Sequence, residues 1–424
     1  MSSLELTGRR PLRGRIRVPG DKSISHRALI LAARASGTSR LRSLSNGDDV
    51  RRTAAAVRSL GAAIDAAGSD GIRVTGGVES LHPSDGPIDV GNSGTTIRLL
   101  SGFCAGFPWL TVLTGDESVS RRPMDRVVAP LREMGASVDC HEPGCLAPLT
   151  VRGGNLRGID YFPPVASAQL KGAVLLAGLG AEGETVVHER AQTRVHTEEM
   201  LAACGADVEV SADGLVTSLR PSELQPFELD VPGDPSQAAF WLVAACITPG
   251  SEVVVEKVYV GPGRSGFLDV LRRMGARVGV EPLDETTANV HARFGALKAT
   301  EVGVLEIPGL IDEIPALAVA AAMAEGVTTF QGAGELRVKE TDRIATLASE
   351  LAAVGARVEA LADGLVISGV PQLSGGHVRS HGDHRVAMAL AVAGLAAPGL
   401  TSIEGWEAVA TSYPDFGGDL QSLL

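Results

Sequence analysis

The stretch DPSQAAFWLVAACI, residues 234–247, decides the fold. Asp234 is a good helix N-cap, and Pro235 suits the first helical position. No charged residue follows Asp234 in this stretch, so a helix here would be apolar on all sides. Such a helix must be buried on every side. The stretch therefore predicts a helix enclosed by other elements.

Five further stretches share the pattern of a polar start followed by an apolar helix. They begin at Asp21, Ser93, Ser167, Asp312 and Asp383, about seventy residues apart. A second pattern lies between them: an amphipathic helix ends in Gly-Ala, and an alternating stretch typical of a strand follows. Its glycines are Gly61, Gly135, Gly205, Gly275 and Gly355. We predict six copies of one unit, each with a buried helix, an outer helix and several strands.

The composition indicates a globular protein of two domains. The chain has 424 residues, 44% of them hydrophobic, and a net charge of −12. The acidic balance and the 4% aromatic content disfavour binding to nucleic acid or an anionic membrane. With no apolar leader and five cysteines without a CxxC pair, we expect a cytoplasmic protein without a disulfide framework. Cys140, His141 and Cys145 fit no standard zinc spacing, so we expect loop and core residues there.

Basic and hydroxyl side chains gather in five motifs, three of which lie at the starts of the first three apolar helices. The motifs are GDKSISHR (20–27), GNSGTTIR (91–98), SRRP (120–123), SAQLK (167–171) and RVHTEE (194–199). Helix N-termini attract anions through free N–H groups and the helix dipole. If the three helices of a domain run parallel, these groups meet at one face. Taken singly, each motif also fits a capped helix, an ordinary turn or surface charge, and RVHTEE suggests an exposed, capped helix.

The second half of the chain adds carboxylates. In LIDEIP (310–315), Asp312 is either an N-cap or a general base. In ELRVKETDR (335–343), a helix would place Lys339 and Arg343 on one side with Glu340 beside them. In GDHR (382–385), His384 follows Asp383 at a helix start. Together the motifs predict a cleft for two polyanionic small molecules, with carboxylates for proton transfer.

These motifs, in this order and ending at SYPDF (412–416), resemble the enolpyruvyl transferases, most closely the members that act on shikimate 3-phosphate. The resemblance implies an inside-out α/β fold of two domains, each with three βαβαββ repeats, and an active site in the cleft between them. Both chain ends would build one domain, from residues 1–19 and 232–424. Residues 20–231 would form the other domain.

The resemblance also implies the reaction. The 5-hydroxyl of shikimate 3-phosphate attacks C2 of phosphoenolpyruvate, C3 is protonated, and the tetrahedral intermediate loses phosphate, without a metal or an organic cofactor. Asp312 would be the base, Glu340 the acid, and Lys22 or His384 could share the proton transfers. Because Lys339 and Arg343 favour ionised Glu340, whereas an acid starts protonated, this assignment is open. The groups binding shikimate 3-phosphate would be Lys22, Ser23, Arg27, Ser167, Ala168, Gln169, Arg194, Asp312 and Lys339; those binding phosphoenolpyruvate would be Lys22, Gly94, Arg122, Gln169, Arg343 and Arg385.

Two features distinguish this chain within the family. Many members carry a lysine where Ser412 stands, so one phosphoenolpyruvate contact is absent or replaced. Gly94 is typical of inhibitor-sensitive members, and we hypothesise that glyphosate competes with phosphoenolpyruvate here.

Features of the sequence disfavour three other functions. A transferase acting on UDP-N-acetylglucosamine is disfavoured by Ser23 after Lys22 and by Glu117 where that family has a loop cysteine. A non-catalytic anion-binding paralogue is disfavoured by the intact Lys22, Arg122 and Asp312. An enzyme that processes RNA ends is disfavoured by the acidic charge. We expect a monomer whose partners are its small-molecule substrates, with no nucleic acid and no membrane.

Overall fold

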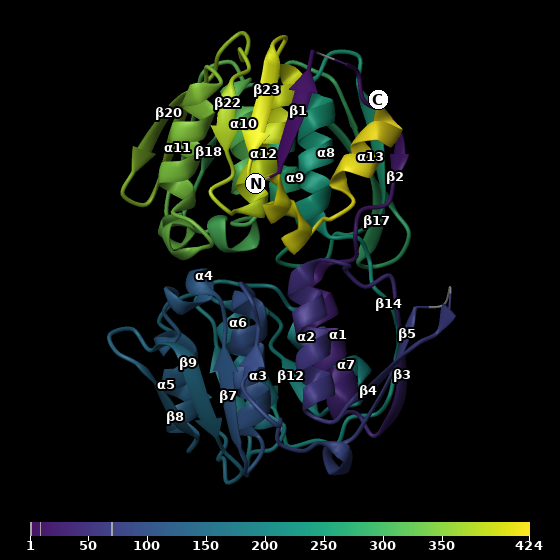
Figure 1. Cartoon of the computed structure of the whole chain (residues 1–424), viewed down its shortest axis with the longest axis vertical. Coiled ribbons are helices and arrows are strands. Elements are labelled where there is room, and N and C mark those ends of the chain that lie inside the picture. Colours follow the sequence, from purple (N-terminus) through teal and green to yellow (C-terminus); the bar gives the residue numbers. More distant parts are fainter. Residues whose placement is uncertain (1, 9, 69–70) are drawn as a thin grey trace. The chain divides into compact units, whose positions relative to one another are not determined.

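A computed structural model describes residues 2–8, 10–68 and 71–424 of the chain. By their contacts the residues divide into two compact units. Unit 1 consists of Met1–Pro19 with Pro232–Leu424, and unit 2 consists of Gly20–Val231. The colours of Figure 1 follow the sequence, so unit 2 runs from purple to teal. No helix in the described part of the chain is both long enough and apolar enough to cross a membrane.

Unit 2 is built from three four-stranded sheets. Its strands are β3 (Gly37–Arg42), β4 (Ala63–Ala66), β5 (Ile72–Gly76), β6 (Ile88–Asp89), β7 (Leu110–Thr114), β8 (Ser137–His141), β9 (Leu146–Arg152), β10 (Asp160–Tyr161), β11 (Thr185–His188), β12 (Val208–Val210), β13 (Val216–Leu219) and β14 (Glu228–Asp230). The sheets have the orders β14-β3-β5-β4, β6-β7-β9-β8 and β10-β11-β13-β12. In each sheet the first pair is parallel and the others are antiparallel, for example β6 with β7 and β7 with β9.

The helices of unit 2 form an inner and an outer set. The inner helices α1 (Lys22–Arg34), α3 (Gly94–Ala105) and α6 (Ala168–Gly178) are buried over most of their length. The outer helices are α2 (Asp48–Ser59), α5 (Asp125–Glu133) and α7 (His196–Ala203), and α4 (Glu117–Ser120) is one short turn. Helices α3 and α6 pack closely because Gly102 has no side chain: a Cβ there would lie 2.0 Å from the carbonyl oxygen of Ala173.

Unit 1 repeats this plan. Its strands are β1 (Ser3–Thr7), β2 (Arg13–Ile16), β15 (Glu252–Tyr259), β16 (Arg277–Pro282), β17 (Thr287–Arg293), β18 (Glu301–Val302), β19 (Val327–Phe330), β20 (Arg357–Leu361), β21 (Gly364–Ser368), β22 (His377–Arg379) and β23 (Leu400–Glu404). They form the sheets β16-β17-β15-β2, β18-β19-β21-β20 and β1-β23-β22. The inner helices are α8 (Pro235–Ile247), α10 (Ile314–Ala322) and α12 (His384–Ala396); the outer ones are α9 (Gly266–Arg273), α11 (Arg343–Ala353) and α13 (Phe416–Leu423).

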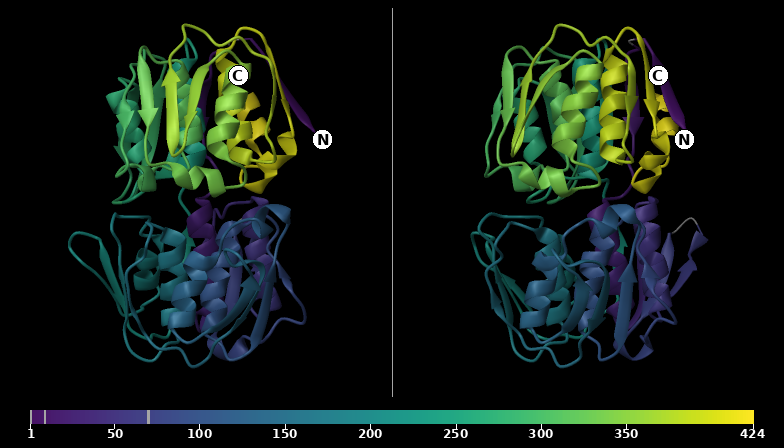
Figure 2. Two further views of the ribbon diagram at one scale, coloured as in Figure 1. Left: turned by 90° about the vertical axis from the view of Figure 1, so that its left-hand side faces the viewer. Right: turned by 60° about the vertical axis from the view of Figure 1, so that its left-hand side comes forward.

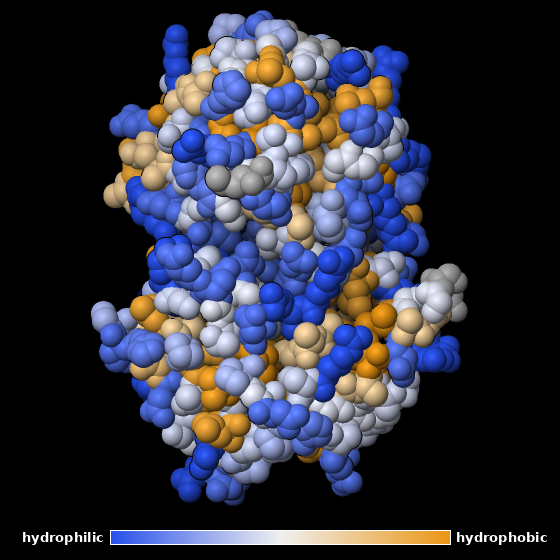
Figure 3. All heavy atoms as spheres, viewed as in Figure 1, coloured by the Kyte–Doolittle hydropathy of each residue, from blue (hydrophilic) through white to orange (hydrophobic). Residues whose placement is uncertain are grey.

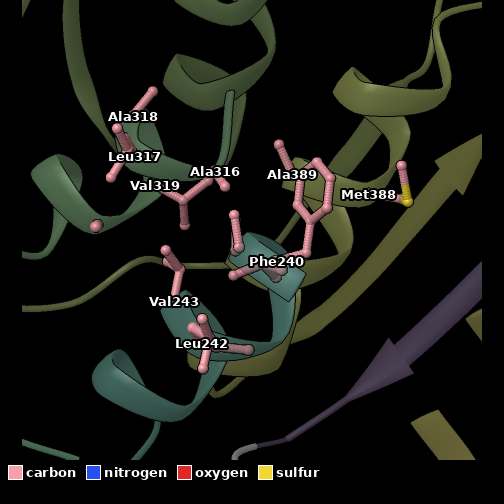
Figure 4. Close-up of a cluster of buried hydrophobic side chains, with 14 of the residues drawn as sticks. Phe240, Leu242, Val243, Ala316, Leu317, Ala318, Val319, Met388 and Ala389 are labelled. Carbon is pink, nitrogen blue, oxygen red and sulfur yellow. The ribbon is translucent and has the colours of Figure 1, made fainter. Parts of the chain in front are cut away.

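The core of unit 1 lies where its three inner helices meet. Figure 4 shows Phe240 and Val243 of α8 with Val319 of α10 and Ala389 of α12 in one cluster. All of these residues are fully buried. The views in Figure 2 show the sheets of each unit on the outside of its helices. The all-apolar helices therefore lie inside and the sheets outside, as the sequence predicts.

Three strands pair with segments far away in the sequence. Strand β2 pairs in parallel with β15, so one strand of this sheet of unit 1 precedes the whole of unit 2 in the chain. Strand β14 pairs in parallel with β3, so the last strand of unit 2 completes its first sheet. Strand β1 pairs with β23 and completes the sixth repeat, whose sheet has three strands instead of four.

The predicted helix starts and ends are largely confirmed. The side chains of Asp21, Ser93, Ser167, Asp234 and Asp383 all cap their helices by accepting a backbone N–H bond. The five Gly-Ala glycines have φ between +79° and +109°, the left-handed conformation typical of a helix C-terminus. The sixth start is wrong, because α10 begins at Ile314 with Glu313 at its N-cap position. Asp312 lies in the preceding turn, and its carboxylate contacts residues of other segments instead of capping α10.

The expectation about the cysteines is wrong for one pair. Cys140 and Cys145 form a disulfide at the turn of the β8–β9 hairpin. Cys104, Cys204 and Cys246 are buried free thiols, and burial raises the pKa of each to about 12. The pair was missed because a hairpin register, which spacing alone does not reveal, brings the two sulfurs together.

On the side shown in Figure 3, hydrophilic residues (blue) and hydrophobic residues (orange) are intermixed on each unit.

Candidate active site

In unit 2, hydrogen bonds join the first turns of the inner helices. Arg98 of α3 donates from Nη1 to Oε1 of Gln169 on α6 (2.8 Å), and Gln169 donates from Nε2 to Oγ1 of Thr95 (2.8 Å). Arg27 of α1 donates from Nη2 to the carbonyl oxygen of Ala168 (3.2 Å). The N-terminal turns of α1, α3 and α6 therefore converge on one face of the unit, which we call the basic face.

Arg27 lies at the buried side of the basic face. Its Nε donates to Oγ1 of Thr197 (2.7 Å) and its Nη1 to Oγ of Ser23 (2.8 Å). Burial lowers the pKa of Arg27 to about 10; Glu198 opposes this shift, and Arg194 adds to it. The guanidinium is thus fixed in place and charged at neutral pH, which suits the binding of an anionic group.

Lys22 lies at the start of α1 and forms an ion pair with Asp49 of α2. The Nζ atom of Lys22 lies 2.7 Å from Oδ2 of Asp49, and the two side chains are 14% and 5% exposed. Asp49 is buried and Lys22 is partly exposed, so the ion pair fixes the ammonium group at the edge of the basic face. Sequence reasoning missed Asp49, because an acid in the first turn of a helix is also typical of a simple dipole interaction.

Arg122 lies against Gly94, the first residue of α3. A Cβ at Gly94 would lie 2.8 Å from Nη1 of Arg122 and 3.0 Å from Nη1 of Arg98. Arg122 also donates from Nη2 to Oγ of Ser118 (2.7 Å), and Arg98 donates to the carbonyl oxygen of Pro123 (3.3 Å). The absence of a side chain at Gly94 brings two guanidinium groups to the N-terminus of α3, a favourable place for a phosphate or carboxylate.

A buried lysine supports the basic face. Lys171 of α6 is fully buried, and its Nζ lies 2.6 Å from Glu189 and 2.5 Å from Glu198. The expectation of an exposed RVHTEE helix is wrong, because His196, Thr197 and Glu198 are buried in the first turn of α7. Lys171 itself is the signal that could have indicated a buried carboxylate, since a lysine inside an apolar helix requires a buried partner.

In unit 1, three cations surround the carboxylate of Asp312. Nη1 of Arg343 lies 3.5 Å from Oδ1, Nζ of Lys339 lies 3.9 Å from Oδ1, and Nη2 of Arg385 lies 3.7 Å from Oδ2. Arg385 also donates to the backbone carbonyl of Asp312 (3.0 Å). We call Asp312 and these cations, with Glu340, the acid–base face. The carboxylate of Asp312 therefore lies close to groups that would hold an anionic substrate.

Arg343 is the central group of the acid–base face. Its Nε lies 2.7 Å from Oδ2 of Asp383, and its Nη2 lies 2.5 Å from Oε2 of Glu340. Burial by itself would lower the pKa of Arg343, but Asp383, Glu340 and Asp312 together raise it above the ordinary value. Arg343 therefore stays charged, and it fixes the orientation of two carboxylates.

The segment ELRVKETDR is not one continuous helix, so helical spacing is not what brings Lys339 and Arg343 together. Gly334–Val338 form a 3₁₀ turn, Lys339 is extended, and α11 begins only at Arg343 after its N-cap Asp342. Lys339 and Arg343 nonetheless meet at Asp312, because the segment between the 3₁₀ turn and α11 brings both side chains to the same carboxylate. His384 is fully buried in the first turn of α12.

A further buried network fixes the chain beside Asp312. Arg264 lies 2.7 Å from Asp234 and 3.1 Å from Glu313, the residue after Asp312. Ser412, which stands where a lysine is common, accepts a hydrogen bond from Nε2 of Gln237 (3.0 Å) and is buried. Ser412 therefore packs within unit 1 and supplies no positive charge.

The fold is that of the enolpyruvyl transferases. An EPSP synthase from Acinetobacter baumannii has a TM-score of 0.86 and 40% sequence identity, covering 99% of this chain and 98% of that chain. The enolpyruvyl transferase NikO from Streptomyces tendae has a TM-score of 0.81 at 21% identity, with 99% and 96% covered, and supports the fold.

The comparisons by sequence point to one family among the enolpyruvyl transferases. The family model described as EPSP synthase (3-phosphoshikimate 1-carboxyvinyltransferase) matches residues 6–420. Two relatives bearing the name 3-phosphoshikimate 1-carboxyvinyltransferase are those of Gloeobacter violaceus (52% identical over 421 residues; 98% of this chain and 97% of the relative) and Bacillus thuringiensis subsp. konkukian (48% over 417 residues; 97% of each).

The chain belongs to the family of 5-enolpyruvylshikimate-3-phosphate (EPSP) synthases. It is accordingly a carboxyvinyltransferase of the shikimate pathway, which leads to aromatic amino acids, and transfer to UDP-N-acetylglucosamine is not favoured. The predicted fold class, enzyme class and family are confirmed.

Proposed function

We propose that the basic face and the acid–base face act on one pair of substrates, shikimate 3-phosphate and phosphoenolpyruvate, by addition and elimination. The 5-hydroxyl of shikimate 3-phosphate adds to C2 of phosphoenolpyruvate while C3 takes up a proton, and the tetrahedral intermediate then loses phosphate. Both substrates carry a phosphate and a carboxylate, so fixed arginines and lysines would stabilise charge throughout the reaction.

The binding roles proposed here are those that the family resemblance implies, and contacts within each face support part of them. For shikimate 3-phosphate, the proposal rests on Arg27, which Ser23 and the Ala168 carbonyl hold in place. For phosphoenolpyruvate, it rests on the two guanidinium groups beside Gly94. The full sets are Lys22, Ser23, Arg27, Ser167, Ala168, Gln169, Arg194, Asp312 and Lys339 for the first substrate, and Lys22, Gly94, Arg122, Gln169, Arg343 and Arg385 for the second. We add Arg98 to the second set, because it bonds Gln169 and borders Gly94.

The proton transfers are assigned to the acid–base face and Lys22. Asp312 is the base for the 5-hydroxyl, since Lys339 and Arg385 lie within 4 Å of its carboxylate and would hold a substrate there. Glu340 is the acid for C3. Its contact with Arg343 favours the carboxylate, but an arriving anionic substrate competes for Arg343 and favours the protonated acid. Lys22 shares in the proton transfers, and His384 is assigned as a proton relay.

The observation that carries the proposal is the single carboxylate of Asp312 among three cations, in a chain of this family. The test is release of phosphate from phosphoenolpyruvate with either shikimate 3-phosphate or UDP-N-acetylglucosamine as acceptor. We expect release only with shikimate 3-phosphate, and its loss in both a Lys22→Met and an Asp312→Asn variant. Release with the nucleotide sugar, or full activity in either variant, would contradict the proposal.

We also propose that the enzyme acts in the cytoplasm as a monomer, without a metal or an organic cofactor. Light scattering of the purified protein at working concentration tests the oligomeric state. Activity that survives dialysis against a chelator tests the cofactor statement, and activity restored only by a metal would contradict it.

A further inference from the structure

The β8–β9 hairpin of unit 2 carries a feature that the reaction does not use. The disulfide between Cys140 and Cys145 closes a loop of four residues at the tip of the hairpin. Cys140 is partly exposed, whereas Cys145 is only 2% exposed. The pairing of β8 with β9 is irregular between Asp139 and His141, so the link lies where the ladder itself is weakened.

This closed loop anchors the segment that bears Arg122. Within the loop, the carbonyl oxygen of Gly144 accepts hydrogen bonds from the backbone N–H groups of Met124 (3.1 Å) and Asp125 (3.3 Å). Met124 is separated from Arg122 only by Pro123, whose own carbonyl accepts from Arg98. The position of Arg122 therefore depends on a turn whose shape the disulfide restricts.

We propose that Cys140 and Cys145 form a reversible thiol–disulfide exchange site for a dithiol reductant, and that the redox state of the pair sets the affinity for phosphoenolpyruvate through Arg122. The second half of this inference rests on the proposed function; the exchange chemistry does not. The β8–β9 hairpin would thus carry a redox modification site that belongs to neither the basic face nor the acid–base face.

The exchange is balanced as follows. A thiolate of the reductant attacks Sγ of Cys140, the more exposed sulfur; the S–S bond breaks, and its electron pair goes to Sγ of Cys145, which takes up a proton. The second thiol of the reductant, as a thiolate, then attacks the reductant's other sulfur, which is bonded to Cys140 in the mixed disulfide, and releases Cys140 as a thiolate. Nη2 of Arg132 lies 3.6 Å from Sγ of Cys140 and stabilises that leaving thiolate until it is protonated. The protein gains two electrons and two protons, and the reductant becomes a disulfide.

Reduction would loosen the turn. Without the link, the four enclosed residues gain conformational freedom, and the carbonyl of Gly144 is held in place less of the time. The two hydrogen bonds to Met124 and Asp125 would weaken, and Arg122 would spend less time beside Gly94. Arg27 and its partners have no contact with this turn among the described interactions, so binding of shikimate 3-phosphate should not change.

The test compares oxidised protein with protein reduced by dithiothreitol. A chelator is present throughout, because Cys140, Glu142 and Cys145 together could hold a metal once the sulfurs are reduced. Alkylation and mass spectrometry should find two new thiols, at Cys140 and Cys145. Amide hydrogen exchange of Met124 and Asp125 should be about tenfold faster in the reduced form. The KM for phosphoenolpyruvate should rise about threefold to tenfold, as expected for weakening of one or two hydrogen bonds, while the KM for shikimate 3-phosphate stays within about twofold.

Variants provide the controls. The double variant Cys140→Ser/Cys145→Ser should match reduced wild-type protein and ignore the reductant. The variant Cys204→Ser alters a buried free thiol outside the pair and should keep the full response.

Each result bears on the inference. If Cys140 and Cys145 stay as free thiols after treatment with oxidised glutathione, or if the amides of Met124 and Asp125 exchange equally fast in both forms, the inference is overturned. If thiol and amide exchange respond but the KM for phosphoenolpyruvate does not, the link to affinity is overturned. If both respond but neither form releases phosphate, the proposed function fails while the exchange site stands.

Discussion

Replacing Gly94 by alanine tests the geometry of the basic face most directly. The new methyl group would lie 2.8 Å from Nη1 of Arg122, whereas ordinary contacts begin at 3.4 Å. Arg122 must therefore move by about 0.6 Å, and the far end of an arginine side chain can do so without disturbing the backbone. A displaced guanidinium aligns less well with an anionic substrate, and hydrogen bonds weaken steeply when misaligned.

We expect the KM for phosphoenolpyruvate to rise about tenfold, or about 1.4 kcal/mol, while the KM for shikimate 3-phosphate stays the same. Because the methyl group fills space that glycine leaves open, inhibition by glyphosate should weaken in the Gly94→Ala variant. The assay is phosphate release with each substrate varied in turn, with and without glyphosate.

Gly266→Ala is the matched control. Gly266 is also the first residue of a helix, but its added Cβ would lie no closer than 3.6 Å to another atom. Both variants gain helix propensity, so a difference between them reports contact with the arginines and not a change in helix stability. An unchanged KM for phosphoenolpyruvate in Gly94→Ala would refute the reasoning, as would potent glyphosate inhibition of that variant beside a resistant parent.

Four other changes have defined outcomes. Asp312→Asn should lower kcat about 10²- to 10⁴-fold while calorimetry still detects binding of shikimate 3-phosphate, and a normal kcat would exclude Asp312 as the base. Glu340→Gln should slow incorporation of solvent deuterium at C3 of phosphoenolpyruvate about 100-fold; incorporation at the parental rate would assign the proton to another group. Lys171→Met leaves two carboxylates buried without their cation, so urea unfolding should show a loss of about 3–5 kcal/mol, and a loss below about 1 kcal/mol would disprove the pairing. Burial, and then the neighbouring cations Lys22 and Arg27, lower the pKa of His26 well below 6.5, so near pH 6 only the unfolded chain binds a proton at this residue. The free energy of unfolding should therefore be at its full value above about pH 6.5 and should fall below that pH by up to about 1.4 kcal/mol per pH unit. The variant His26→Gln should lack this slope.

The sequence predicted the local structure well because its signals are local. An N-cap, an apolar stretch and a left-handed glycine each act within a few residues of one another. Five of six predicted caps and all five glycines are therefore confirmed. The exception, Asp312, looks like a cap in the sequence because its partners lie more than twenty residues away along the chain.

Burial was the weaker prediction where charged residues were involved. A charge-rich motif is usually solvated, so RVHTEE suggested an exposed helix. In the structure Glu198 is buried because Lys171, on another helix, is buried against it. Neither residue alone reveals the pairing, since it depends on the tertiary contact that brings Lys171 of α6 to Glu198 of α7.

By itself, then, the sequence determined the repeat, the order of buried and outer helices, and the types of side chain available at each helix start. These follow from periodicity and from capping, which involve neighbours in the chain. Only the tertiary structure decided which of those side chains meet: Lys339, Arg343 and Arg385 around Asp312, Arg122 beside Gly94, and Cys140 bonded to Cys145. Such contacts depend on strand register and on close packing of helices, and these are settled by the burial of the whole core at once.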